Sequence, residues 1–144
     1  MMSIDNPVAE MTLDECWELL RDHEFGRLAY RVVDEVHLVP INYVAAGGSG
    51  TDTLLMRTAP GNKLFAAALG SDVAFEIDWH DTERAWSVVV RGSLRRLEED
   101  EQHRLDGDPH EPWVPTRKDE VVELVPVAVT GRRFGLRPGV TEED

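Results

Sequence analysis

The sequence is short of cysteine, of basic residues and of long apolar segments, and each shortage excludes a class of protein. Its single cysteine, Cys16, cannot form an internal disulfide, which fits a reducing compartment and predicts a cytoplasmic protein. Lysine and arginine total 15 against 28 acidic residues, a net charge of −13 that disfavours nucleic acid and anionic membrane surfaces as partners. No apolar run approaches the roughly 20 residues that cross a bilayer, and Asp5 and Glu10 stand where a secretory signal would be basic.

The composition that remains is that of one folded domain. Of the 144 residues, 42% are hydrophobic and 30% are charged, a balance typical of globular proteins. We expect a single domain over residues 12–137, a flexible N-terminus over residues 1–11 and a disordered acidic tail over residues 138–144.

Helical spacing of apolar residues predicts one helix near the start of this domain. Thr12 and Glu15 have the spacing of a capping box, in which each side chain satisfies a free backbone N–H. Apolar residues within 13–22 then fall on one helical face: Leu13, Cys16, Trp17 and Leu20. We therefore expect Trp17 to pack in the core and Cys16 to be a structural thiol rather than a catalytic one.

Alternation of apolar and polar residues then predicts about six strands. They cover residues 27–33, 36–44, 53–58, 72–79, 85–97 and 120–130. A tight hairpin is expected between the first two strands, a glycine-rich loop over 45–51, and short helices over 64–69 and 98–105. Gly92 and Pro126 predict a bulge or bend within their strands. Because most strands follow one another through short turns, the predicted fold class is mainly β, a small antiparallel barrel with peripheral helices.

The segment from Arg57 to Lys63 carries the clearest functional signal. Arg57 and Thr58 end a predicted strand, and the chain then enters a helix through a Pro-Gly pair, with Lys63 in the first turn. A guanidinium, a hydroxyl and an ammonium at a helix start suit a phosphate monoester. The alternative is that Arg57 and Lys63 are solvated surface charges beside an ordinary helix start, and the spacing alone leaves both interpretations open.

Six short motifs also follow one another along the chain. They are TLDECWELL at 12–20, GRLA at 26–29, VPINY at 39–43, RT and GNKL within 57–64, VAFE at 73–76, and WSV followed by RG within 86–92. In this order they resemble the pyridoxamine 5′-phosphate oxidase-like proteins, and more narrowly the flavin-nucleotide-binding branch that includes the nitroimidazole-resistance proteins. The resemblance covers residues 12–97 closely and residues 121–136 loosely.

This resemblance implies a split β-barrel homodimer that binds FMN in two symmetric sites at the subunit interface. Carried over to this chain, it implies that Arg57, Thr58 and Lys63 hold the FMN phosphate and that Asn62 shapes that corner. The segment that runs beside the isoalloxazine ring, and offers backbone groups to its polar edge, corresponds to Pro40, Ile41 and Asn42.

A further segment approaches the flavin in the family, and we expect it to come from the partner subunit. It corresponds in this chain to Trp86, Ser87 and Val88. Without the resemblance, Trp86 in a β-branched strand is a core or interface aromatic. Some relatives use a second basic residue for the phosphate, for which Arg91 and Arg132 are candidates.

The activity implied by the resemblance is that of an FMN-dependent oxidoreductase of the reductase or nitroreductase type. A donor such as NAD(P)H would reduce FMN, which would pass electrons to a small-molecule acceptor. The C-terminal substrate-phosphate signature of the true oxidase has only a faint echo at residues 131–134, which argues against oxidation of pyridoxamine phosphate. The alternatives are the same fold binding a deazaflavin or haem, or a non-catalytic flavin carrier or sensor.

No catalytic side chain and no metal site is predicted. His80 lies between two predicted strands and fits a polar turn better than a proton donor. His103 and His110 lie near acidic residues, but their spacing matches no ordered set of metal ligands.

Overall fold

The computed structural model describes residues 8–47, 52–59, 62–98 and 120–136. Within them lie, in chain order, β1 (Val8–Glu10), α1 (Leu13–Asp22), β2 (Phe25–Val32), β3 (Glu35–Asn42), β4 (Val44–Ala46), β5 (Thr53–Thr58), α2 (Lys63–Ala68), β6 (Asp72–His80), β7 (Arg84–Arg96) and β8 (Glu120–Gly135). All the paired strands are antiparallel, which confirms the mainly-β class.

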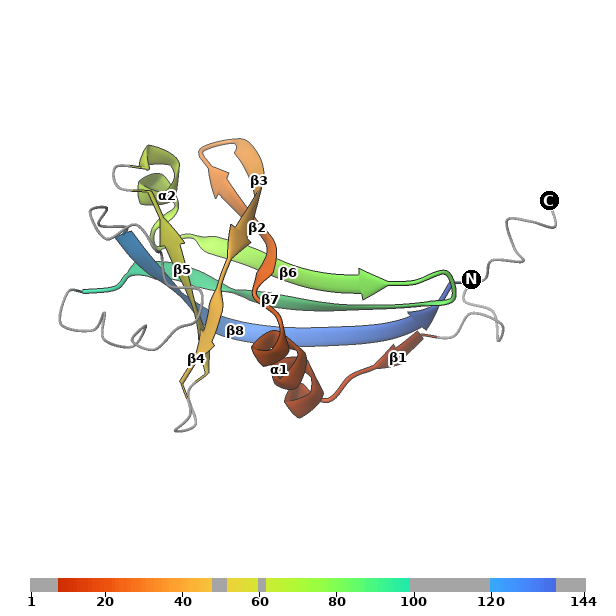
Figure 1. The fold of residues 1–144 in the computed structure, drawn as a ribbon. Coiled ribbons are helices and arrows are strands. Elements are labelled where there is room, and N and C mark those ends of the chain that lie inside the picture. The colour runs from red at the N-terminus through yellow and green to blue at the C-terminus, as the bar shows by residue number, and fades with distance from the viewer. Residues whose placement is uncertain (1–7, 48–51, 60–61, 99–119, 137–144) are drawn as a thin grey trace.

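The strands form one strongly curled sheet (Figure 1). Their order is β3-β2-β6-β7-β8-β5-β4, with β1 paired to β8. The edge strands β3 and β4 are joined by Tyr43 alone, so the two edges cannot lie far apart. β3 also contacts β5, and the line along which these two strands approach each other is the seam of the barrel. The result is a half-open antiparallel barrel, which confirms the predicted split-barrel architecture.

Tyr43 fixes the point at which the chain passes from one edge to the other. Its side chain is buried, its hydroxyl donates to the Leu20 carbonyl at 2.7 Å, and its ring meets that of Phe75 edge-on at 4.9 Å. Its N–H donates to the Glu24 carbonyl at 2.9 Å. Burial, assisted by the charges of Asp22 and Glu24, raises the pKa of Tyr43 well above its usual value, so the hydroxyl remains a donor.

The sheet has a core face and an open face, because successive residues of a strand point to opposite sides. On β6 the core face carries Val73, Phe75 and Ile77, all buried. The open face carries Ala74, Glu76 and Asp78. The register places residues of neighbouring strands on one face or the other, so Arg27, Pro40 and Ser87 belong to the open face.

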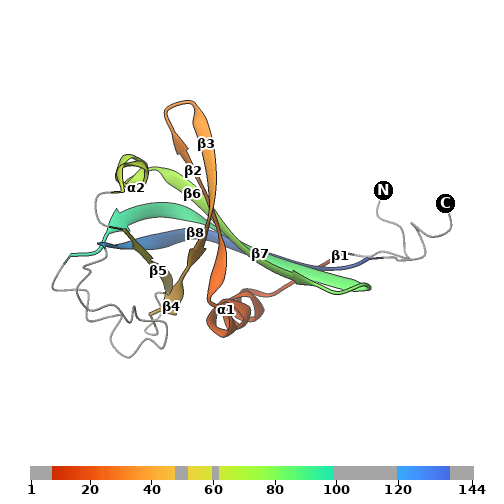
Figure 2. The same ribbon diagram turned by 45° about the horizontal axis from the view of Figure 1, so that its top comes forward.

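Helix α1 packs on the core face, as the sequence predicts (Figure 2). Its inner side adds Cys16, Trp17 and Leu20 to the main core. The capping box is present: the Glu15 N–H donates to the Thr12 hydroxyl at 3.1 Å, and the Thr12 N–H donates to the Glu15 carboxylate at 2.8 Å. This backbone hydrogen bond lowers the pKa of Glu15.

The capping box makes a first testable contribution to stability. We expect Thr12→Ala to lower the free energy of unfolding by about 1 kcal/mol, because it leaves an N–H of the first turn without its side-chain acceptor. Urea denaturation followed by circular dichroism measures this. Thr82→Ala, at an exposed threonine outside the helices, is the matched control. Equal losses in the two variants would show that the cap contributes nothing.

Within the described residues the structure has eight strands, where the sequence predicts about six. Val8–Glu10, placed by the sequence in the flexible N-terminus, forms β1 against β8. The strand predicted over 36–44 breaks at Tyr43, and Val44–Ala46 forms a separate strand, β4, paired with β5. Both are three residues long, too short for alternation to reveal them.

The bulge predicted near Gly92 and Pro126 is confirmed. Arg91 pairs with Ala128 but Gly92 pairs with Pro126, so Val127 is the extra residue. A Cβ at Gly92 would collide with the Val125 carbonyl oxygen, which only glycine avoids. The acidic helix expected over 98–105 and the tail from residue 138 fall outside the described residues, apart from Glu98.

Candidate functional site

Arg57 and Thr58 end β5 beside β8, opposite Val121 and Glu120 respectively. Thr58 is buried on the core side, and its hydroxyl accepts from the Asn62 side-chain amide at 3.2 Å. Arg57 is partly exposed and points to the other side of the strand. The structure therefore brings Thr58 and Asn62 together at this corner, with Arg57 on the neighbouring face.

Helix α2 follows this corner directly. It spans Lys63–Ala68, one residue from the predicted range, and the Ala66 N–H donates to the Asn62 carbonyl at 3.1 Å. The chain leaves it through Gly70 at φ +82°, where glycine avoids strain. Because α2 has fewer than two turns, a phosphate site here depends on side chains. The Lys63 side chain lies outside the described atoms.

Pro40, Ile41 and Asn42 end the edge strand β3. Pro40 and Asn42 are exposed on the open face, whereas Ile41 is buried in the core. In the described sheet β3 pairs only with β2, so alternate backbone groups of this segment point away from the ladder and are available to a ligand. The Asn42 amide nitrogen donates to the Glu24 carbonyl at 3.2 Å.

The segment Trp86–Val88 does not present its three side chains together. Val88 is fully buried, and Trp86 packs against the core and edge-on to the His23 ring, with centroids 5.1 Å apart. Ser87 lies on the open face, opposite Asp78 and Arg132. Only Ser87 therefore shares a face with Pro40 and Asn42, whereas the side chains of Ile41 and Val88 are buried in the core.

Within one chain the predicted ring-contact segments are separate. β3 and β7 are separated by β2 and β6, three strand spacings or roughly 14 Å. Arg91 and Arg132 are also distant from Arg57. Leu97, which directly follows β7, lies level with Arg57, and Arg91 is six residues away from it along the extended chain, or roughly 20 Å. One chain thus unites the β3 and β5 segments, but neither of these arginines lies beside Arg57.

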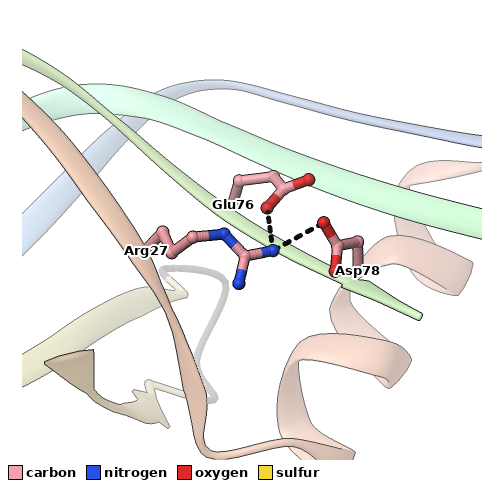
Figure 3. Close-up of polar contacts among 3 residues, drawn as sticks. All are labelled: Arg27, Glu76 and Asp78. Carbon is pink, nitrogen blue, oxygen red and sulfur yellow. Dashed lines mark hydrogen bonds and ion pairs between the residues drawn. The ribbon is translucent and has the colours of Figure 1, made fainter. Parts of the chain in front are cut away.

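A charged cluster that the sequence analysis missed lies between Pro40 and Ser87 on the open face (Figure 3). The Nη2 atom of Arg27 donates to Glu76 Oε1 at 2.9 Å and to Asp78 Oδ2 at 2.6 Å. The register places Arg27 opposite Pro40 and Asp78 opposite Ser87. The only sequence signal was Glu76 and Asp78 two residues apart on one strand, because the pairing with Arg27 spans about fifty positions.

The two carboxyl groups of this cluster have shifted pKa values in opposite directions. Partial burial, together with Asp78, raises the pKa of Glu76. Burial alone would also raise that of Asp78, but its interactions with Glu76 and with the Arg27 guanidinium lower its pKa below the usual value. Both carboxylates raise the pKa of Arg27, which stays charged.

Other candidate chemistries find little support in the described part of the chain. No three His, Cys, Asp or Glu side chains there gather closely enough to bind a metal ion. Cys16 is buried, and burial raises the pKa of its thiol, as expected of a structural cysteine. Neither α1 nor α2 is long and apolar enough to span a membrane.

Residues 12–133 match the pyridoxamine 5′-phosphate oxidase family, and the chain belongs to this family. An uncharacterised protein of Mycobacterium tuberculosis is 32% identical over 131 residues, covering 88% of this chain and 86% of that protein. The structure of an FAD-binding protein from Mycobacterium smegmatis is 36% identical with a TM-score of 0.73, covering 88% of this chain and 98% of that one. A Bacteroides thetaiotaomicron protein assigned to 5-nitroimidazole antibiotic resistance shares the fold. It is 14% identical, with a TM-score of 0.73, over 91% of this chain and 90% of that one.

Proposed function

We propose that the protein binds a flavin nucleotide, FMN in the first instance, and acts as a flavin-dependent oxidoreductase on a small-molecule acceptor. The observation that carries the proposal is the seam of the barrel. There the exposed edge of Pro40–Asn42 on β3 lies on a strand that contacts β5, whose end carries Arg57 and Thr58. A ring-binding edge and a phosphate-binding end thus belong to adjoining strands of one chain.

The chemistry of these groups fits the two ends of a flavin nucleotide. Arg57 offers a paired guanidinium donor to a phosphate, and a lysine follows at position 63. The unpaired backbone edge of Pro40–Asn42 suits the polar rim of a planar heterocycle, as strand edges suit any extended hydrogen-bonding partner. Thr58, Asn62 and Ile41 shape the site from its buried side.

When bound, the flavin would supply the hydride chemistry, accepting from a donor such as NAD(P)H and passing electrons to the acceptor. The residues of this chain would bind and orient it. The backbone N–H of Asn42 at the β3 edge and side-chain donors of the open face would favour negative charge on the polar rim of the ring. No side chain is assigned a proton-transfer role.

A homodimer is part of the proposal, since Trp86–Val88 and Pro40–Asn42 of one chain are separate. The open face and the hairpin β2–β3 leave large apolar side chains exposed: Phe25, Val36, Leu38 and Val125. A second copy of the chain that covers this face would bury them and bring its own Ser87 segment toward the first chain's β3.

Two alternatives have specific support. The 36% identical structure is that of an FAD-binding protein, which favours FAD as the nucleotide, since FAD also carries phosphate. That protein is known by what it binds rather than by a reaction, which favours a flavin carrier as the second candidate function. A deazaflavin or haem in the same barrel remains the alternative cofactor to be tested.

The proposal is tested by the absorption spectrum of the purified protein and by titration with FMN, FAD, riboflavin, a deazaflavin and haem. We expect FMN to bind at least about tenfold more tightly than riboflavin, because each charged hydrogen bond to the phosphate contributes about 1.5–3 kcal/mol. Reduction of the bound flavin by NADH or NADPH, followed by transfer to a quinone or nitro compound, would distinguish the oxidoreductase from the carrier. Binding of haem or deazaflavin alone, or of no flavin, would refute the proposal.

A further inference from the structure

The cluster of Arg27, Glu76 and Asp78 stands where nothing in the fold requires charge. All three side chains are on the open face and remain partly exposed, at 40%, 31% and 43%. Exposed ion pairs contribute little to stability, so stability does not account for a cluster of three. Its position does suggest a role, because Arg27 is the cross-strand neighbour of Pro40 and Asp78 that of Ser87.

The two carboxylates hold Arg27 by a single nitrogen. Both accept from Nη2, at 2.9 and 2.6 Å, and the other two guanidinium nitrogens make no drawn contact with either (Figure 3). Arg27 forms no further side-chain hydrogen bond with the described residues. The guanidinium is therefore oriented at one end and presents donors at the other, which a rigid planar group can do and a lysine cannot.

The charges of the cluster indicate which part of a ligand it suits. One guanidinium and two carboxylates sum to −1, so the cluster does not attract a phosphate from a distance. A neutral edge that carries carbonyl acceptors can still take hydrogen bonds from the directed N–H groups. The pyrimidine edge of an isoalloxazine ring, with its carbonyl oxygens, has this chemistry.

The other side chains beside Pro40 supply few donors. Proline has none, and the Asn42 amide nitrogen already donates to the Glu24 carbonyl. On the strip of the open face between Pro40 and Ser87, Arg27 is the one cation among the described residues. A ring bound along Pro40–Asn42 would thus find a charged donor in Arg27, the cross-strand neighbour of Pro40.

We propose that Arg27 is a binding residue for the pyrimidine edge of the flavin ring, and that Glu76 and Asp78 are positioning residues that orient it. This inference rests on the proposed flavin binding and deepens it. It divides recognition between two places: Arg57 and its neighbours would hold the phosphate, whereas Arg27 would hold the ring.

The test compares FMN with riboflavin, which has the same ring and no phosphate. We expect Arg27→Gln to raise the dissociation constants of both ligands by the same factor, about tenfold or more, as loss of a charged donor predicts. Flavin fluorescence quenching measures both constants without requiring turnover. The control is Arg31→Gln. Arg31 lies on the same face of β2, four residues after Arg27, so this variant removes the same charge and should leave both dissociation constants unchanged.

A second variant separates hydrogen bonding from net charge and from folding. Arg27→Gln combined with Glu76→Gln keeps the formal charge of the cluster at −1 and avoids two unneutralised carboxylates. It should lose affinity for both ligands as Arg27→Gln does. A role in orienting the reduced ring should also appear as a more negative flavin midpoint potential, by about 30 mV for each tenfold extra loss of affinity for the reduced form.

The outcomes distinguish this inference from the proposed function. If the unaltered protein binds neither ligand, the proposed function fails and the role of Arg27 fails with it. If it binds both, while the Arg27 variants match Arg31→Gln, only the role of Arg27 is overturned. Weaker binding of FMN alone would place Arg27 at the phosphate. Weaker binding that accompanies loss of the dimer, as measured by sedimentation, would make Arg27 an interface residue. Either result overturns the inference.

Discussion

Tyr43→Ala should lower the free energy of unfolding by about 3–5 kcal/mol, the usual cost of truncating a fully buried aromatic side chain. The residue is 2% exposed, packs against Phe75 and is the single link between the two edge strands of the barrel. A loss of this size is a large part of the roughly 5–15 kcal/mol that stabilises a typical domain. Chemical denaturation at one fixed protein concentration measures it, since a dimer couples stability to concentration.

Tyr43→Phe separates the hydroxyl from the ring in the same experiment. It keeps the packing on Phe75 but leaves the buried Leu20 carbonyl without its donor, which should cost about 1–3 kcal/mol. Leu13→Ala, at an apolar residue of α1 that is 58% exposed, is the control and should cost less than about 1 kcal/mol. A Tyr43→Ala loss no larger than that of the control would contradict the role assigned to this link.

Local pattern was enough to predict the elements that depend on local physics. The capping box and the apolar face of residues 13–22 defined α1 at its exact bounds, and β5 was likewise predicted over Thr53–Thr58. The bulge at Gly92 followed from a glycine in the middle of a β-branched strand. Each of these signals lies within a few residues of the feature that it predicts.

Features that depend on distant pairing could not be predicted in this way. β1 and β4 exist because β8 and β5 offer them an edge, not because three residues prefer to be extended. The cluster of Arg27 with Glu76 and Asp78 requires the register of β2 against β6, which no local pattern encodes. Motif order indicated the family, but it did not show which of Trp86 and Ser87 faces the core.

Arg57→Ala should raise the dissociation constant of FMN by about tenfold to a hundredfold, because a guanidinium–phosphate hydrogen bond contributes about 1.5–3 kcal/mol. Arg57→Ala combined with Lys63→Ala should raise it further. The dissociation constant of riboflavin should not change in either variant, because it lacks the phosphate. Fluorescence titration at two salt concentrations would also show a weaker salt dependence once the cationic groups are gone.

The control for this prediction is Arg84→Ala, which removes one positive charge at the start of β7 from a side chain that is 77% exposed. Since the whole protein carries a charge of −13, loss of any cation makes its general field more negative and could weaken an anion indirectly. A local site predicts a large loss for Arg57→Ala and almost none for Arg84→Ala, whereas a general field predicts similar losses. Equal losses of FMN affinity in the two variants, or an unchanged FMN dissociation constant in the double variant, would show that the end of β5 does not bind the phosphate. The ring would then have to bind through the β3 edge and the open face alone.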